Sequence, residues 1–448
     1  MRAVLPGAAR GRSSAGVLHT RAASSKSAMT SPKDLEDLSS DANVLSLAYG
    51  GHNEDILNKA KELLAESTRH ALEVEPPTCP NLNYGPQLGS DRFRSSLASF
   101  LSRRYGREVK SERLVLTCGA THALHLVTSQ LFSEGGLVLV EEPSYYLALG
   151  LLKDDLGMRL VSVPLEEDGP NLALLEQQLT KLRAGCQFTP TPRRPFWCLM
   201  YLIPDHHNPT GASISEEKRR GLVELARRFD VLLFCDDVYN LLTYPPARVG
   251  PLLITYDHDS PPTPGVTPPT PVGHVVSAGT FSKICAPGVR VGWLEAPPRM
   301  IEILSESKIL FSGGAVNGFM SSVMASAIQL GLLDKHLDGI IAVLQEKLEL
   351  TLAFLGRTLP PERYQWSVPC GGFYVWLCCP FDTVPFAAWC EKNRGVLARA
   401  GAAFSVNGSG CQHHLRISIS YLSRDTLQEA LSRLCDALLE YEAEHGGK

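Results

Sequence analysis

Short apolar runs alternate with helix-forming segments through the middle of this 448-residue chain. The strand-like runs are residues 113–117, 137–140, 196–203, 231–236 and 274–277. Amphipathic segments such as 91–105 and 215–229 lie between them. Alternation of this kind predicts an α/β fold with a mostly parallel sheet covered by helices. Ligands of such sheets bind beyond the carboxyl ends of the strands, so the polar loops after these runs form the candidate site.

Composition narrows the class of protein. Hydrophobic residues make up 44% of the chain and charged residues 20%, which is typical of a soluble globular protein. The net charge of −4 provides no basic field for nucleic acid. The chain has no run of 18 or more apolar residues, the length that a helix needs to span a bilayer. The 12 cysteines show no metal-ligand spacing, so they are interpreted as reduced, buried residues of an intracellular protein without a metal site.

The segment Ser277–Trp293 carries the clearest chemical pattern. Lys283 follows Thr280 and Ser282, and Arg290 comes seven positions later, beyond a Pro-Gly turn. Two hydroxyls and a guanidinium can clamp a phosphate, and a lysine beside that phosphate can form a Schiff base with an aldehyde on the same ligand. Pyridoxal phosphate carries both groups. The alternative is that Lys283 is a surface lysine and Arg290 belongs to a structural ion pair.

Two further motifs precede this segment. Asn208 lies in Asn-Pro-Thr-Gly, and Asp236 ends an apolar run and is followed by Tyr239. Asn-Pro-Thr-Gly, then Asp-x-x-Tyr, then Ser-Lys, in that order, resembles the fold-type I pyridoxal-phosphate enzymes. Within them the chain is similar to aminotransferases that act on 2-aminoadipate, kynurenine and aromatic amino acids. The resemblance covers residues from about 82 to about 420 and implies a seven-stranded type of central sheet.

The resemblance assigns roles around the cofactor ring. Asp236 would keep the pyridine nitrogen protonated, which the cofactor needs in order to accept electrons. Asn208 and Tyr239 would hydrogen-bond the ring oxygen. Tyr145, with Tyr146 as the alternative, would stack on the ring. The competing interpretation of Asp236 is a helix N-cap, and either tyrosine could be a core residue.

The resemblance also implies how the phosphate and the substrate are bound. The phosphate ligands would be Gly119, Ala120, Thr121, Thr280, Ser282 and Arg290. Tyr84, in Asn-Tyr-Gly-Pro, would contact the phosphate from the partner subunit of a homodimer. His122 stands where an uncharged polar residue is expected. Arg416 would bind the substrate α-carboxylate together with Asn208, and the alternative for Arg416 is a structural ion pair.

The implied activity is transamination between an L-amino acid and a 2-oxo acid such as 2-oxoglutarate. Lys283 would act as both the cofactor attachment point and the general acid/base. A lyase or synthase on the same fold is the first alternative. The second is a non-catalytic pyridoxal-phosphate-binding protein, such as a regulator with a DNA-binding domain before Tyr84, but no basic domain occurs there. The amino donor is not identified.

The chain is expected to have four parts. Residues 1–33 are basic and contain no acid, which indicates either a mitochondrial transit peptide or an N-terminal extension without a targeting role. The predicted location is therefore mitochondrial or cytoplasmic. Three further segments complete the prediction: 34–80, which packs on the C-terminal domain; 81–335, the large cofactor-binding domain with a Pro-rich insert at 257–273; and 336–448, a smaller α+β domain.

Overall fold

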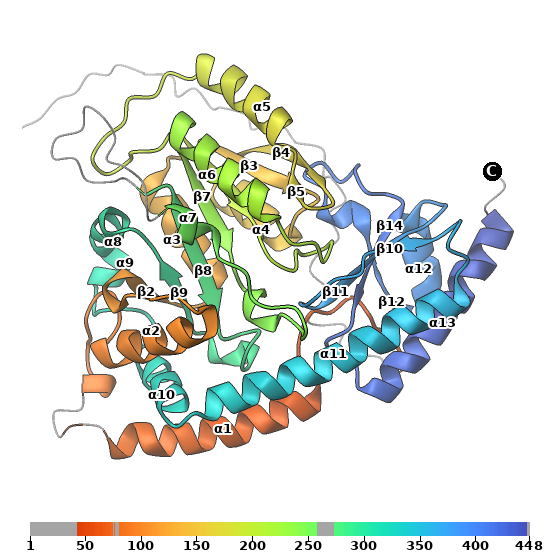
Figure 1. Cartoon of the computed structure of the whole chain (residues 1–448), viewed down its shortest axis with the longest axis horizontal. Coiled ribbons are helices and arrows are strands. Elements are labelled where there is room, and N and C mark those ends of the chain that lie inside the picture. Colours follow the sequence, from red (N-terminus) through yellow and green to blue (C-terminus); the bar gives the residue numbers. More distant parts are fainter. Residues whose placement is uncertain (1–42, 75, 77–79, 258–272, 446–448) are drawn as a thin grey trace, which may run out of the picture. The chain divides into compact units, whose positions relative to one another are not determined.

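The computed structural model describes residues 43–74, 76, 80–257 and 273–445. The predicted basic tail at 1–33 lies outside the described residues. So does the Pro-rich insert, except for its ends at Asp257 and Gly273. Figure 1 shows a large sheet wrapped by helices, with a smaller sheet formed by the C-terminal part of the chain.

The large sheet contains eight strands among the described residues, in the order β2-β9-β8-β7-β6-β3-β4-β5. Their bounds are β2 Leu114–Thr117, β3 Leu137–Glu142, β4 Arg159–Glu166, β5 Gly169–Pro170, β6 Cys198–Leu202, β7 Val231–Asp236, β8 Val275–Thr280 and β9 Gly292–Glu295. Pairs between β4, β3, β6, β7 and β8 are parallel, whereas β9 runs antiparallel to both of its neighbours. The predicted mostly parallel sheet of seven-stranded type is confirmed. The short antiparallel β5 extends it by one strand.

The strands of this sheet are buried on both faces. On β7, Leu232 and Phe234 belong to one apolar cluster, while Leu233 and Cys235 belong to another on the opposite face. Such continuous apolar runs are typical of parallel sheets that carry helices on both sides. Successive side chains of a strand point to opposite faces of the sheet. The position of a residue at the end of a strand therefore decides on which face its side chain lies.

Helices cover the sheets. Their bounds are α1 Glu54–Glu73, α2 Asp91–Tyr105, α3 Ala120–Leu131, α4 Tyr146–Gly150, α5 Leu172–Ala184, α6 Glu216–Phe229, α7 Leu253–Asp257, α8 Pro298–Ser305, α9 Lys308–Phe311, α10 Gly318–Gln329, α11 Leu332–Thr358, α12 Thr383–Arg394 and α13 Arg424–His445. The predicted helix at 91–105 is confirmed at both ends, since Ser90 caps its first turn and Gly106 ends it in the left-handed conformation. No helix in the described ranges combines the length and the apolar character that a membrane crossing requires.

The smaller sheet has the order β10-β11-β14-β13. Its strands are β10 Gln365–Trp366, β11 Tyr374–Cys378, β13 Arg399–Ala400 and β14 His414–Ser418. The predicted strand at 371–376 thus begins three residues later and extends to Cys378. Near the N-terminal end of the described chain, β1 (Leu45–Ser46) pairs in parallel with β12 (Val396–Leu397). The domain boundaries expected near residues 80 and 335 stay a prediction.

Candidate active site

Lys283 follows β8 in a tight turn and is largely enclosed. Its Nζ donates a hydrogen bond of 3.0 Å to the carbonyl oxygen of Gly50, in the segment between β1 and α1. The rings of Tyr239 and Phe373 lie 5.9 and 5.4 Å from this nitrogen, measured to their centroids. Burial lowers the pKa of Lys283, so the neutral amine is more abundant near neutral pH than for an exposed lysine.

Asp236 ends β7 and is 8% exposed. Its Oδ2 accepts a hydrogen bond of 2.6 Å from the hydroxyl of Tyr201 on the neighbouring β6, and its Oδ1 is buried without a hydrogen-bond partner among the described residues. Burial raises the pKa of Asp236 to about 6, although the Tyr201 hydrogen bond and the Lys283 charge oppose this change. The tyrosine therefore fixes the carboxyl group and leaves one oxygen available for a cationic partner.

A cradle for an anion lies beside the lysine turn. The hydroxyl of Thr280 is 2.9 Å from that of Ser282, and Arg290 Nη1 donates to Ser282 Oγ at 3.3 Å. Gly119 precedes the first residue of α3 with φ of +92°, and a Cβ there would lie 3.3 Å from Arg290 Nη2 and 3.5 Å from Thr280 Oγ1. A side chain at this position would therefore fill the space between the hydroxyls and the helix start, where Ala120 and the exposed Thr121 begin α3.

Arg290 itself lies in a constrained turn. Its φ is +48°, a left-handed conformation that is uncommon for residues other than glycine. The Asn317 side chain donates to the carbonyl oxygens of Val289 and Arg290, at 3.0 and 2.6 Å. These two bonds hold the turn that points the guanidinium toward Ser282.

His122 has a structural role in the same region. The backbone N–H of Cys118 donates to His122 Nδ1 at 3.1 Å. Burial lowers the pKa of His122, which favours the neutral ring that can accept this bond. The residue that the sequence left without a role thus shapes the loop before Gly119.

Arg416 lies on β14 and is 2% exposed. Its Nη1 donates to Asn208 Oδ1 at 2.9 Å, and its Nη2 donates to the carbonyl oxygen of Ala48. No carboxylate pairs with it among the described ion pairs, and its buried Nε has no hydrogen-bond partner among the described residues. A buried guanidinium with a vacant donor fits a carboxylate ligand better than a structural ion pair.

Of the tyrosines predicted to contact the cofactor, Tyr239 is buried and Tyr84 is exposed. Tyr145 and Tyr146 make an edge contact at 5.4 Å, and Tyr146 also contacts Phe404 at 5.7 Å, so the structure leaves the choice of stacking residue open. Tyr239 is buried, and its hydroxyl lies 3.3 Å from that of Tyr374. Tyr84 is 85% exposed and lies against Gly313, without a described contact to the other predicted cofactor residues.

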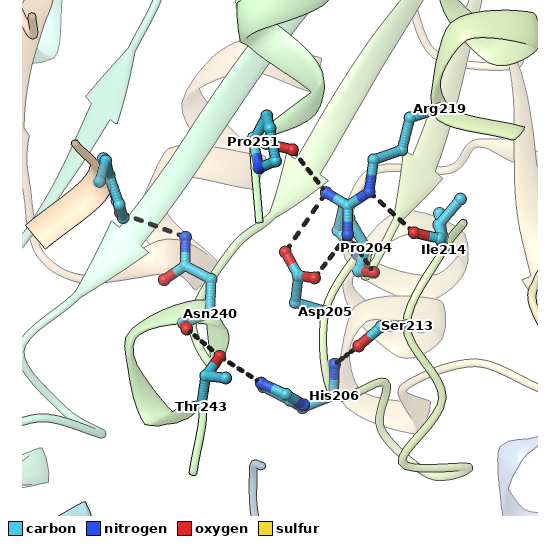
Figure 2. Close-up of polar contacts among 10 residues, drawn as sticks. Pro204, Asp205, His206, Ser213, Ile214, Arg219, Asn240, Thr243 and Pro251 are labelled. Carbon is cyan, nitrogen blue, oxygen red and sulfur yellow. Dashed lines mark hydrogen bonds and ion pairs between the residues drawn. The ribbon is translucent and has the colours of Figure 1, made fainter. Parts of the chain in front are cut away.

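The loop that carries Asn208 is held by one buried arginine (Figure 2). Arg219, on α6, is 4% exposed and forms an ion pair with Asp205. Its remaining N–H groups donate to three backbone carbonyl oxygens: Pro204 at 3.2 Å, Ile214 at 2.8 Å and Pro251 at 3.1 Å. Pro204 and Ile214 flank the loop, so a single guanidinium holds both of its ends. No local pattern in the sequence marks this residue, and it is not among the predicted site residues.

His206 anchors the middle of the same loop. Thr243 donates its hydroxyl to the carbonyl oxygen of Asn240 at 2.8 Å, so it accepts the 2.8 Å bond from His206 Nε2 (Figure 2). Burial lowers the pKa of His206 to about 4, and the ring is therefore neutral at physiological pH. A Cβ at Gly371 would lie 2.4 Å from His206 Nε2, so the ring lies directly against the chain that leads into β11.

We expect Arg219→Met to destabilise the fold by about 3–5 kcal/mol, because it strands a buried carboxylate and frees three carbonyl groups. It should also weaken cofactor binding, because Asn208 loses its support. Chemical unfolding and cofactor titration measure the two effects. The matched control is Arg220→Met, at the exposed neighbour that pairs with Glu216 and lies over the Tyr256 ring, and it should change neither quantity appreciably. Equal behaviour of the two variants would contradict this role.

These residues fit pyridoxal phosphate. The cradle of Gly119, Thr280, Ser282 and Arg290 suits a phosphate, the free Oδ1 of Asp236 suits a protonated pyridine nitrogen, and the Lys283 amine suits an aldehyde. These residues lie at the carboxyl ends of β7 and β8, at the start of α3 and, for Arg290, in the turn before β9. The fold and the site define a fold-type I pyridoxal-phosphate enzyme.

Comparison with known proteins places the chain more closely. Residues 48–434 match the model of the aminotransferase class I and II family, and the chain belongs to that family. It is 29% identical to aromatic-amino-acid aminotransferase 1 of Thermococcus litoralis, over 85% of this chain and 84% of the relative. It is also 29% identical to the 2-aminoadipate transaminase of Thermus thermophilus, over 91% of this chain and 93% of the relative. The solved structure of Pyrococcus horikoshii kynurenine aminotransferase superposes with a TM-score of 0.77 at 26% identity, covering 91% of this chain and 94% of that one. The chain is therefore a pyridoxal-phosphate-dependent aminotransferase.

Proposed function

We propose that this aminotransferase takes its amino group from an aromatic amino acid, kynurenine or 2-aminoadipate and passes it to a 2-oxo acid such as 2-oxoglutarate. The observation that carries the proposal is the buried Arg416 guanidinium, which keeps a free Nε–H beside Asn208. An α-carboxylate is common to every donor and acceptor of this kind. The relatives named for these three donors support the choice among side chains.

The residues divide the chemistry among them. Pyridoxal phosphate, when bound, supplies the aldehyde that receives the amino group and the ring that accepts the electron pair. Lys283 Nζ has a pKa lowered by burial, and as a neutral amine it can take the proton from the substrate Cα and later return it. Arg416 and Asn208 hold the α-carboxylate, which aligns the Cα–H bond with the lysine.

The test is a scan of amino donors with 2-oxoglutarate as acceptor. Phenylalanine, tyrosine, kynurenine and 2-aminoadipate should each convert the lysine-bound cofactor spectrum to that of the amine form, with aspartate and alanine far slower. Arg416→Ala is the control, because it should slow every donor. A donor preference that excludes all three proposed classes would refute the substrate assignment while leaving the aminotransferase activity intact.

We also propose that the active enzyme is a homodimer that shares its sites. In one copy, Tyr84 is exposed, and neighbouring large apolar side chains are exposed as well: Leu82 at 64%, Ile309 at 57% and Phe311 at 60%. An apolar surface of this kind is typical of protein interfaces. The Tyr84 hydroxyl would bind the phosphate held by the partner subunit.

Subunit complementation tests the shared site. Tyr84→Phe and Lys283→Ala should each lower activity, and mixed dimers should contain one site in which both Tyr84 and Lys283 are intact. Activity should therefore rise above the mean of the parents after subunit exchange, which is followed by mass spectrometry of tagged chains. The same mixture without exchange is the control. Complete exchange without recovery would show that Tyr84 does not act across subunits.

A further inference from the structure

Tyr374 lies where three parts of the site meet, although nothing in the sequence marks it. It is the first residue of β11 and is 3% exposed. Its strand pairs with β14, where Tyr374 lies opposite Ser418 and Trp376 lies opposite Arg416. Tyr374 is thus two residues along β11 from Trp376, which pairs with Arg416 on β14.

The hydroxyl group of Tyr374 faces the lysine side of the site. Tyr239 donates its O–H to Tyr374 Oη at 3.3 Å. A Cβ built on Gly50 would lie 1.9 Å from the same oxygen, so the hydroxyl occupies the space where residue 50 would otherwise carry a side chain. The carbonyl oxygen of Gly50 accepts the hydrogen bond from Lys283 Nζ. One phenol oxygen therefore contacts both the tyrosine and the backbone segment that border the lysine.

The ring of Tyr374 faces the substrate side. The guanidinium carbon of Arg416 lies 4.2 Å from the centroid of this ring and 4.8 Å from that of Phe404. The two aromatic rings, Asn208 and the Ala48 carbonyl together restrict the plane of the guanidinium. A stacked arginine presents its N–H groups in a fixed direction, which a bidentate carboxylate contact requires.

We propose that Tyr374 is a positioning residue with two separable functions: its hydroxyl supports Tyr239 as a hydrogen-bond donor, and its ring orients Arg416 for the substrate carboxylate. The inference rests on the proposed roles of Tyr239 and Arg416. A phenol can both donate and accept. When Tyr239 turns its proton to the oxygen of the cofactor ring, the Tyr374 O–H can donate to Tyr239 Oη, and chained hydrogen bonds strengthen one another. The substitution Tyr374→Phe would keep the ring function and remove the hydroxyl function.

The hydroxyl function is tested with Tyr374→Phe in the cofactor-loaded enzyme, by following cofactor absorbance against pH without substrate. A weaker donor at Tyr239 stabilises the ring oxygen anion less, so the midpoint of the absorbance change should move to higher pH, by roughly 0.5–1 unit. Tyr239→Phe should move it further. The double variant should match Tyr239→Phe alone, because the support acts only through Tyr239. An unchanged midpoint in Tyr374→Phe, or full additivity in the double variant, would overturn this function.

The ring function is tested by comparing Tyr374→Phe with Tyr374→Leu. Loss of the stacked ring should raise the KM for the amino donor by about 5–30-fold, with a smaller change in kcat, whereas Tyr374→Phe should keep a KM close to that of the parent enzyme. Equal KM values in the two variants would overturn this function. Should Tyr374→Leu fail to fold, Phe404→Leu is measured instead: it removes the second ring near the guanidinium and should raise the KM similarly, whereas an unchanged KM would overturn this function.

The parent enzyme separates the two levels of the proposal. If the parent enzyme lacks a lysine-bound cofactor spectrum, the proposed role of Lys283 is wrong. If Arg416→Ala leaves the KM unchanged, the proposed role of Arg416 is wrong. A parent that passes both checks while the Tyr374 variants behave like the parent would show that only the positioning role of Tyr374 is wrong.

Discussion

Lys283→Ala is expected to bind pyridoxal phosphate but to turn over amino acids several orders of magnitude more slowly than the parent enzyme. Binding persists because the cradle at Ser282 and Arg290 and the carboxyl group of Asp236 do not depend on the lysine. Turnover should be lost because we propose that the lysine amine is both the attachment point for the cofactor and the group that moves the Cα proton. Stopped-flow spectra of the loaded variant with a saturating donor measure the loss.

A second buried lysine provides the control for this experiment. Lys347, on α11, is 2% exposed. Its Nζ donates a hydrogen bond to the Ser420 carbonyl oxygen, and burial lowers its pKa to about 8. It is thus a second buried lysine with a lowered pKa, but the residues proposed to hold the phosphate lie around Lys283. Borohydride reduction of the parent enzyme should therefore fix the cofactor to the Lys283 peptide and leave Lys347 unmodified. A cofactor label on Lys347, or activity retained in Lys283→Ala, would contradict the assignment of the site.

Arg416→Ala is expected to retain cofactor content and absorbance but to lower kcat/KM by roughly 10² or more, mostly through KM. The guanidinium touches neither the cradle nor Asp236 in the described contacts. Asn208, its partner among the predicted cofactor residues, stays in the loop that Arg219 anchors, so the cofactor should be retained. Removal of a charged bidentate partner worth about 3 kcal/mol or more accounts for the size of the effect. Arg416→Lys should restore only part of the loss, because an ammonium keeps the charge but not the fork.

The arginine on the adjoining strand is the matched control. Arg399, on β13, lies directly opposite Arg416 in the sheet and provides the same charge in the same neighbourhood. Arg399→Ala should change the donor KM much less, if the effect of Arg416 comes from a specific contact rather than from local positive charge. Equal losses in the two variants would favour the charge explanation. Unfolding of Arg416→Ala would favour a structural role for the guanidinium, through its bonds to Asn208 and the Ala48 carbonyl oxygen.

The sequence was sufficient for the parts of the molecule that follow from local patterns. The apolar run at 231–236 is β7, and the helix predicted at 91–105 has the predicted ends. The run at 274–277 begins one residue before β8, which continues to Thr280. Lys283 and Asp236 then lie at adjoining strand ends, because polar residues that follow parallel strands collect at one edge of the sheet. Their roles, and those of the other predicted site residues, stay predictions that the variants above address.

The supporting residues could not be predicted, because their partners are distant in sequence. Tyr201 meets Asp236 from 35 positions away, Tyr374 meets Tyr239 from 135, and Gly50 meets Lys283 from 233. A tyrosine within an apolar strand has the same local pattern whether it fills the core or positions a carboxyl group. Arg219 likewise reads as one of several charged residues on α6, and only the packed fold shows that it is buried.

Two contacts between the N-terminal and C-terminal parts of the described chain have a consequence for biosynthesis. Arg416 donates to the Ala48 carbonyl oxygen across 368 positions, and β1 waits for β12 to be made before it can pair. A nascent chain that has just exposed Lys283 outside the ribosome therefore contains the lysine proposed to hold the cofactor but not Arg416, which is proposed to bind the substrate carboxylate. Contacts of such long range also slow folding, because their loop entropy is lost before the contacts form. The residues proposed to hold the cofactor are thus made before the arginine proposed to bind the substrate.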